Sequence, residues 1–144
     1  MENINILSLV ISTLIPMLLG TLWYSKALFG KAWMESIGMT EEKQKSGNMP
    51  LIMGLAIVMA FLMSFFLLNF NNGPGQEGEF DTFGHGVAHG VVLSLFLIIP
   101  TFVSNGLFEQ KPWKNIIINC LYWLVALALM SGVLDVMNHW PNTV

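Results

Sequence analysis

The chain has no arginine, a single cysteine and little charge of either sign. Its 144 residues include six lysines and nine acidic residues, so that only 10% of the chain is charged, whereas soluble domains carry about 25%. This density cannot cover the outside of a soluble globular domain, which excludes that class. A net charge of −3 offers phosphate no basic surface, which excludes nucleic-acid binding. The lone Cys120 excludes an internal disulfide framework and a paired-cysteine metal or redox motif.

Hydrophobic residues, in contrast, make up 54% of the chain and gather in long runs. A helix that crosses about 30 Å of hydrocarbon needs roughly 20 apolar residues. Runs of this length occupy residues 4–24, 50–70, 85–103 and 116–137. They lack the two-residue alternation of barrel strands, and the first lacks the basic start and cleavage site of a signal peptide. The sequence therefore predicts an all-α fold, an integral membrane four-helix bundle that forms a single domain over residues 1–144 in the lipid bilayer.

The lysines indicate how the bundle is oriented. With four spans, the connections 25–48 and 105–114 share one side of the membrane, and all six lysines lie in them. Connections rich in lysine stay in the cytoplasm. We therefore expect a multi-pass protein of the cell (cytoplasmic) membrane with both termini outward.

Small residues recur at four-residue intervals in three of the runs, and such stripes let membrane helices approach closely. They are Ala56, Ala60 and Ser64 in the second run, Gly86, Gly90 and Ser94 in the third, and Ala128 and Gly132 in the fourth. The stripes suit packing within one chain as well as contacts between chains, so a second copy or another membrane protein is an expected partner. Pro16 and Pro100 are expected to bend the first and third spans.

The connection between the first two runs contains a mixed aromatic and charged segment. Residues 27–38 place the apolar Leu28, Phe29, Trp33 and Ile37 among the charged Lys31 and Glu35, a pattern typical of a short helix in the membrane interface. An ordinary polar loop with a few aromatic residues is the alternative.

Ionisable residues in or beside membrane helices are functional candidates, because their burial in lipid is costly. His85 and His89 stand four residues apart at the start of the third run, and Asp135 and His139 stand four apart at the end of the fourth. Such pairs share a helix face, and antiparallel helices place both pairs at the outward side. Three imidazoles and a carboxylate suit a divalent transition metal such as zinc. A proton relay and a purely structural role are the two alternatives.

No nucleophile elbow and no glycine-rich phosphate loop occurs in the sequence, so no catalytic residue is predicted. An outer-leaflet metalloenzyme would require a metal at the histidine pairs with an open coordination position.

Two segments resemble a known family. Gly-Thr-Leu-Trp-Tyr-Ser at 20–25 and Leu-Phe-Gly-Lys-Ala-Trp-Met at 28–34 are similar to the signature of small membrane proteins called domain of unknown function 1761. Further landmarks are His89-Gly90, Pro100, Leu107-Phe108-Glu109, Ile118-Asn119 with Tyr122, and Met130-Ser131-Gly132. The resemblance implies about four membrane helices and no established activity. Residues that it favours as functional are Trp23, Tyr24, Phe29, Gly30, Lys31, Trp33, His89 and Asn119.

The chain departs from the family pattern at two positions. Lys26 stands where the family commonly has proline, and Asp135 stands where an acid is not expected in most relatives. Of the four candidate ligands, the resemblance therefore carries only His89.

Two functions fit these observations. The first is a small binding or transport-type protein that uses the polar groups at the outward ends of the third and fourth helices. The second is a non-enzymatic accessory or scaffold subunit that docks a partner through the aromatic segment 23–34 at the cytoplasmic interface.

Overall fold

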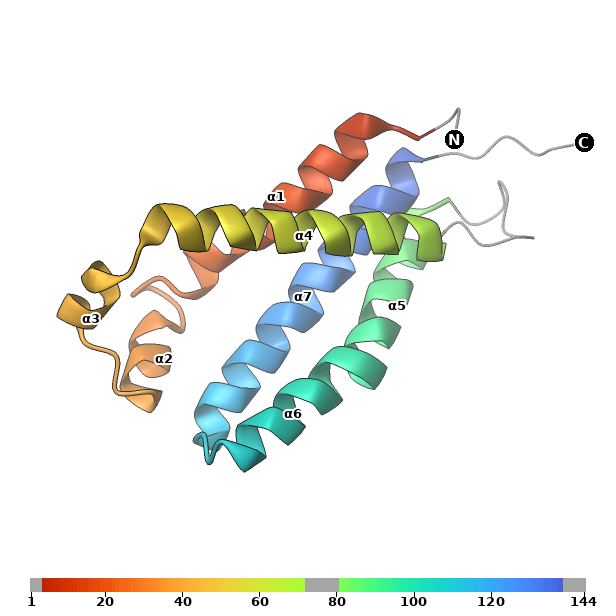
Figure 1. The fold of residues 1–144 in the computed structure, drawn as a ribbon. Coiled ribbons are helices and arrows are strands. Elements are labelled where there is room, and N and C mark those ends of the chain that lie inside the picture. Colours follow the sequence, from red (N-terminus) through yellow and green to blue (C-terminus); the bar gives the residue numbers. More distant parts are fainter. Residues whose placement is uncertain (1–3, 72–80, 139–144) are drawn as a thin grey trace, which may run out of the picture.

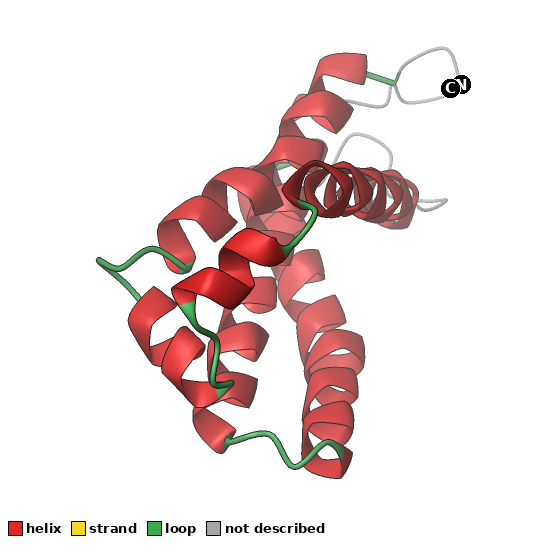
Figure 2. Ribbon diagram, turned by 60° about the vertical axis from the view of Figure 1, so that its left-hand side comes forward, coloured by secondary structure: helices red, strands yellow, loops and turns green. Residues whose placement is uncertain are grey.

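The computed structural model describes residues 4–71 and 81–138, and within these ranges it is helical with short connections (Figures 1 and 2). Four helices are long and apolar enough to cross a membrane. They are α1 (Ile6–Trp23), α4 (Met49–Asn71), the continuous helix Phe83–Phe108 and α7 (Trp113–Met137). The predicted all-α architecture with four long apolar helices is confirmed, and the third helix extends beyond the predicted 85–103 at both ends.

The third long helix contains one turn of different geometry. It consists of α5 (Phe83–Leu93), a π-helical turn η1 (Ser94–Ile98) and α6 (Ile99–Phe108). Pro100 has no N–H for the helical ladder, and its ring crowds the carbonyl four residues earlier. The wider turn directly before it accommodates this break, a common use of π-helical turns. Pro16, by contrast, lies inside α1, which continues to Trp23.

Two short helices join α1 to α4. They are α2 (Gly30–Ser36) and α3 (Glu41–Ser46), and α2 packs against α7. The side chain of Thr40 caps α3 by accepting from the backbone N–H of Lys43. The short helix predicted within 27–38 is thus present as α2.

Helix α7 is the centre of the bundle. Its most apolar stretch is 56% buried, against 22% or less in the other three long helices, and it contacts α1, α2, α4 and α5. Helix α4 packs on α1 and α7 and crosses them at a steep angle, while α5 and α6 run beside α7 (Figure 1).

The closest helix pair is α5 with α7, and glycines permit it. A Cβ atom at Gly86 would lie 2.3 Å from the carbonyl oxygen of Ser131, and one at Gly90 would lie 2.3 Å from that of Leu127. A Cβ atom at Gly132 would lie 2.7 Å from the side-chain ring of Phe83. The small-residue stripes of the third and fourth runs therefore serve packing within the chain.

The bundle has two distinct ends (Figure 1). The starts of α1 and α5 and the ends of α4 and α7 lie together at one end, which we call the histidine end. The connection from α1 to α4, which contains α2 and α3, lies at the other end together with the turn between α6 and α7 and the start of α7. We call it the lysine end, because residues 24–48 and 109–114, which form it, carry all six lysines.

Candidate functional site

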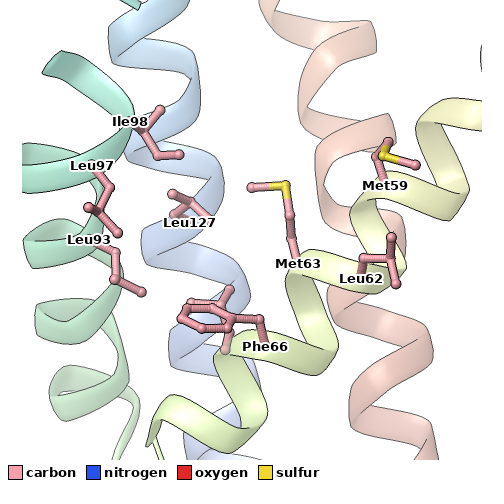
Figure 3. A pocket seen from close by; sticks show the side chains of 9 residues that line it. Met59, Leu62, Met63, Phe66, Leu93, Leu97, Ile98 and Leu127 are labelled. Atoms are coloured by element: carbon pink, nitrogen blue, oxygen red, sulfur yellow. The ribbon is translucent and has the colours of Figure 1, made fainter. Parts of the chain in front are cut away.

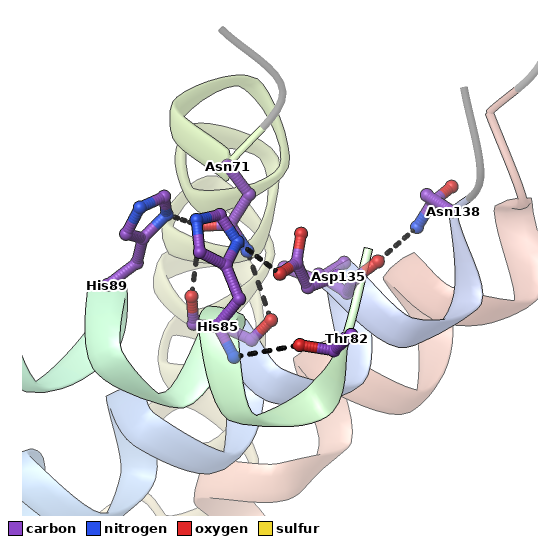
Figure 4. A network of polar contacts seen from close by, with 8 residues as sticks. Asn71, Thr82, His85, His89, Asp135 and Asn138 are labelled. Atoms are coloured by element: carbon purple, nitrogen blue, oxygen red, sulfur yellow. Dashed lines mark hydrogen bonds and ion pairs between the residues drawn. The ribbon is translucent and has the colours of Figure 1, made fainter. Parts of the chain in front are cut away.

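A cluster of polar side chains from α4, α5 and α7 occupies the histidine end (Figure 4). The side chain of Thr82 accepts from the backbone N–H of His85 and so fixes the start of α5. His85 and His89 then lie on one face in the first two turns, with ring centroids 4.2 Å apart. The four-residue spacing predicted that these two side chains share a helix face, and the structure shows them side by side.

His85 reaches across to α7. Its Nδ1 lies 2.8 Å from Oδ2 of Asp135, and the His85 side chain is 21% exposed whereas that of Asp135 is 1% exposed. When Asp135 is ionised its carboxylate can only accept, and the imidazole then donates from Nδ1. The other oxygen of Asp135, Oδ1, is buried and has no hydrogen-bond partner among residues 4–71 and 81–138.

His89 is oriented by Asn71, the last residue of α4, which is 2% exposed. The amide nitrogen of Asn71 donates to the carbonyl oxygen of Ser131 at 3.0 Å, and its Oδ1 accepts from the Ser131 hydroxyl at 3.0 Å. The same Oδ1 lies 3.1 Å from Nδ1 of His89. Because a carbonyl oxygen can only accept, Ser131 fixes which way the amide points, and His89 must therefore donate from Nδ1.

This arrangement leaves the other ring nitrogen of His89, Nε2, with the lone pair. The ring is half-buried, is contacted edge-on by Phe70 at 5.2 Å between centroids, and receives no hydrogen bond at Nε2 from the described part of the chain. A histidine whose far nitrogen donates to a fixed acceptor is the arrangement that proteins use to orient an imidazole toward a ligand.

A complete metal centre is not assembled from these side chains. Within the described ranges, no group of three or more histidine, cysteine, aspartate or glutamate side chains is placed to hold a metal ion. Tightly held zinc takes three or four protein ligands. His139 lies outside the described residues, so the set of His85, His89, Asp135 and His139 stays a prediction.

A second polar group, beside the first, ties α1 to α7. Asn138 is 1% exposed. Its amide nitrogen donates to Ser8 Oγ and to the carbonyl oxygen of Leu134, both at 2.7 Å, and its oxygen accepts from the backbone N–H of Asn5. Both polar atoms of the amide are engaged inside the chain, so this group holds the helix ends together and offers nothing to a ligand.

The aromatic residues favoured by the family resemblance gather at the lysine end, against α7. The indole N–H of Trp23 donates to the carbonyl oxygen of Ile118 at 3.2 Å, and the hydroxyl of Tyr24 donates to Oδ1 of Asn119 at 2.8 Å. Trp33 meets Tyr24 edge to face at 5.3 Å between centroids. Burial raises the pKa of Tyr24 well above its usual value, with Tyr122 adding to the shift, so the phenol stays protonated and donating.

Gly30 belongs to the same contact region, the packing of Trp23, Tyr24 and Trp33 against α7, which we call the aromatic joint. A Cβ atom there would lie 2.1 Å from the carbonyl oxygen of Tyr24, which is a forbidden distance, so only glycine allows the chain to turn into α2 at this point. Phe29 packs on Trp23 with 4.7 Å between centroids, while Lys31 is exposed. The motif therefore joins α1 and α2 to α7.

Sequence reasoning named most of these residues but missed Asn71, and it named Ser131 only as a landmark of the family resemblance. Asn71 directly follows the second apolar run, 50–70, and so falls outside the helix that the sequence predicts. Its burial depends on how α4 is rotated about its axis, which hydropathy does not reveal. The available signals were an asparagine directly after an apolar run and a serine next to Gly132 of the fourth run's small-residue stripe.

Comparison with known proteins adds one finding. A family model described as Protein of unknown function (DUF1761) matches residues 7–135. The match includes the aromatic joint, His85, His89, Asn71 and Asp135. No curated protein and no solved structure matches the chain.

Proposed function

The chain belongs to the DUF1761 family, and on that premise we propose that it is a small binding or transport-type membrane protein. Its ligand site is the cluster of His85, His89, Asn71 and Asp135 at the histidine end. The observation that carries this proposal is the hydrogen bond from His89 Nδ1 to Asn71 Oδ1, which leaves a lone pair on Nε2 that no donor in the described part of the chain engages. Such a nitrogen accepts a hydrogen-bond donor or a Lewis acid.

Two further features support a site rather than a purely structural tie. Asp135 holds a carboxylate that is 1% exposed and has an unsatisfied oxygen within the described ranges, and such groups inside a membrane are costly and tend to be functional. Asn138, which directly follows α7, is an example of a purely structural residue, because both of its side-chain polar atoms form hydrogen bonds within the chain.

The aromatic segment 23–34 gives less support to the accessory-subunit alternative. Trp23 and Tyr24 use their N–H and O–H groups on α7, and Trp33 packs on Tyr24. A docking surface for a partner would present such groups outward.

Zinc ion tests the acceptor directly, because it binds imidazole lone pairs. We expect purified protein in detergent to bind one Zn²⁺ per chain weakly, as measured by isothermal titration calorimetry. His89→Ala should weaken this binding by at least about tenfold, the loss seen when even an outer partner of a metal ligand is removed. Asn69→Ala is the matched control, because Asn69 is exposed on α4 and, among the residues that the structure describes, its side chain bonds to the Phe65 carbonyl alone. Equal binding by wild type and His89→Ala would remove the cluster as a ligand site.

We further propose that the histidine end faces outward, since the lysine end carries the charges that remain in the cytoplasm. In a Cys120→Ala background, Gly84→Cys should react with a membrane-impermeant maleimide on intact cells. Lys43→Cys should react only after permeabilisation. Gly84 is a suitable position because a Cβ there meets nothing within 4 Å, and Lys43 is exposed on α3. The reverse labelling pattern would show that the proposed orientation is wrong and that the histidine end faces the cytoplasm.

A further inference from the structure

An apolar groove opens between α4 and the wall formed by α5, η1 and α7. Its volume is about 350 Å³, and all of its lining side chains are apolar. Figure 3 shows Met63 and Phe66 of α4 facing Leu93, Leu97 and Ile98, with Leu127 of α7 between them. The groove exists because α5 is held tightly on α7 by glycines, while α4 crosses α7 at a steep angle (Figure 1).

The groove leads to the polar cluster. Phe66 and Leu93 line its near end, and each lies one helical turn from a member of the cluster's rim, Phe70 on α4 and His89 on α5. The rings of Phe66 and Phe70 stack with 6.0 Å between centroids, and Phe70 meets His89 at 5.2 Å. From His89 to Leu97 is eight residues, a rise of about 12 Å. The groove therefore ends at Leu93, one helical turn from His89 on the same face of α5.

We propose that the groove and the cluster form one site for a neutral amphiphile that has a single apolar chain and a hydroxyl head. The chain lies between α4 and η1, and the hydroxyl donates a hydrogen bond to Nε2 of His89. This inference rests on the proposed function and names its ligand class. The groove alone would accept any hydrocarbon, so selectivity comes from the head.

The chemistry of the cluster determines that head. Nε2 of His89 carries a lone pair, so the ligand must donate. The buried carboxylate of Asp135 lies at the same helix end, hydrogen-bonded to the neighbouring imidazole, and a like charge brought next to it is disfavoured. A carboxylate or phosphate head is therefore rejected, and a hydroxyl head of the same chain length is accepted.

The probe is dodecan-1-ol with a photoactivatable diazirine at the end of its chain, cross-linked to detergent-purified protein and mapped by peptide mass spectrometry. We expect labelling on the peptides that contain Met63 and Leu97. The matching carboxylic acid and phosphate ester should label about fivefold less, the loss that corresponds to one unmade hydrogen bond. Equal labelling by all three probes would overturn the inference, because the groove would then be a lipid-filled surface without head selection.

Two variants on the same π-helical turn test the groove itself. Leu97→Trp places a larger ring at the groove wall and should remove labelling, whereas Leu95→Trp, an exposed leucine outside the groove, should not. Zn²⁺ binding should persist in both variants. Unchanged labelling in Leu97→Trp would overturn the inference, because the probe would then lie outside the groove.

The His89→Ala variant distinguishes a failure of this inference from a failure of the proposed function. His89→Ala should lower both alcohol labelling and Zn²⁺ binding. Loss of Zn²⁺ binding with alcohol labelling unchanged would overturn the amphiphile and leave the ligand site standing. Absence of Zn²⁺ binding in wild type would overturn the ligand site itself.

Discussion

Gly90→Ala is expected to destabilise the bundle by about 3 kcal/mol, the upper end of the usual cost of overpacking a well-packed contact. The added Cβ would lie 2.3 Å from the carbonyl oxygen of Leu127 and 2.7 Å from the Cα of Ala128. Both are backbone atoms of α7, so no side chain can rotate away. The two helices must separate along their contact, and α7 is the helix on which the others pack.

Gly84→Ala provides the matched control, because it makes the same change in the same helix. A Cβ at Gly84 meets nothing within 4 Å, and alanine is the better helix former by about 1 kcal/mol. This variant should be as stable as wild type or slightly more stable. Unfolding in one detergent, followed by circular dichroism, measures both variants. Equal stability of the two would contradict the close approach of α5 to α7.

The long helices could be predicted because lipid leaves few choices. A bilayer requires about 20 apolar residues per helical span and satisfies no backbone group, so hydropathy alone located α1, α4 and α7. The end of the third helix was harder to place. Residues 104–108 include Ser104, Asn105 and Gly106, and their polarity hides a helix that continues to Phe108.

The contacts across the histidine end were predictable where periodicity fixes a face. Four-residue spacing put Gly86 with Gly90 and His85 with His89 on shared faces, and antiparallel neighbours brought Asp135 to the same depth. The rotation of α4 leaves a weaker trace, because apart from the stripe of Ala56, Ala60 and Ser64 its surface is apolar almost all round. Asn71 stands seven residues after Ser64, on the face of that stripe, but nothing in the sequence shows that this face meets Ser131 and His89.

The aromatic motif illustrates a different limit. Its residues were identified by resemblance, yet their role depends on what α7 presents to them. Trp23 and Tyr24 use Ile118 and Asn119 as hydrogen-bond acceptors, and sequence order gives no indication that these segments meet.

Asn71→Leu is the most informative change at the site. Leucine is of similar size but cannot accept from His89 or exchange hydrogen bonds with Ser131. Loss of these bonds at a residue that is 2% exposed should cost about 2 kcal/mol of stability. The larger effect is expected in binding. Without Asn71 as the acceptor for Nδ1–H, the tautomer of His89 that has its lone pair on Nε2 is no longer stabilised. Zn²⁺ affinity should therefore fall by about 10- to 100-fold.

The tautomer of His89 decides between an orienting and a merely structural role for Asn71. Two-bond ¹H–¹⁵N spectra of histidine-labelled protein distinguish Nδ1–H from Nε2–H. Wild type should show His89 protonated at Nδ1, and Asn71→Leu should shift it toward Nε2–H. Asn69→Leu makes the same substitution two residues earlier, at an exposed position, and should change neither the spectrum nor the affinity. If Asn71→Leu lowers stability but leaves the tautomer and Zn²⁺ affinity unchanged, Asn71 only ties α4 to α7, because a tie contributes to folding without directing the imidazole.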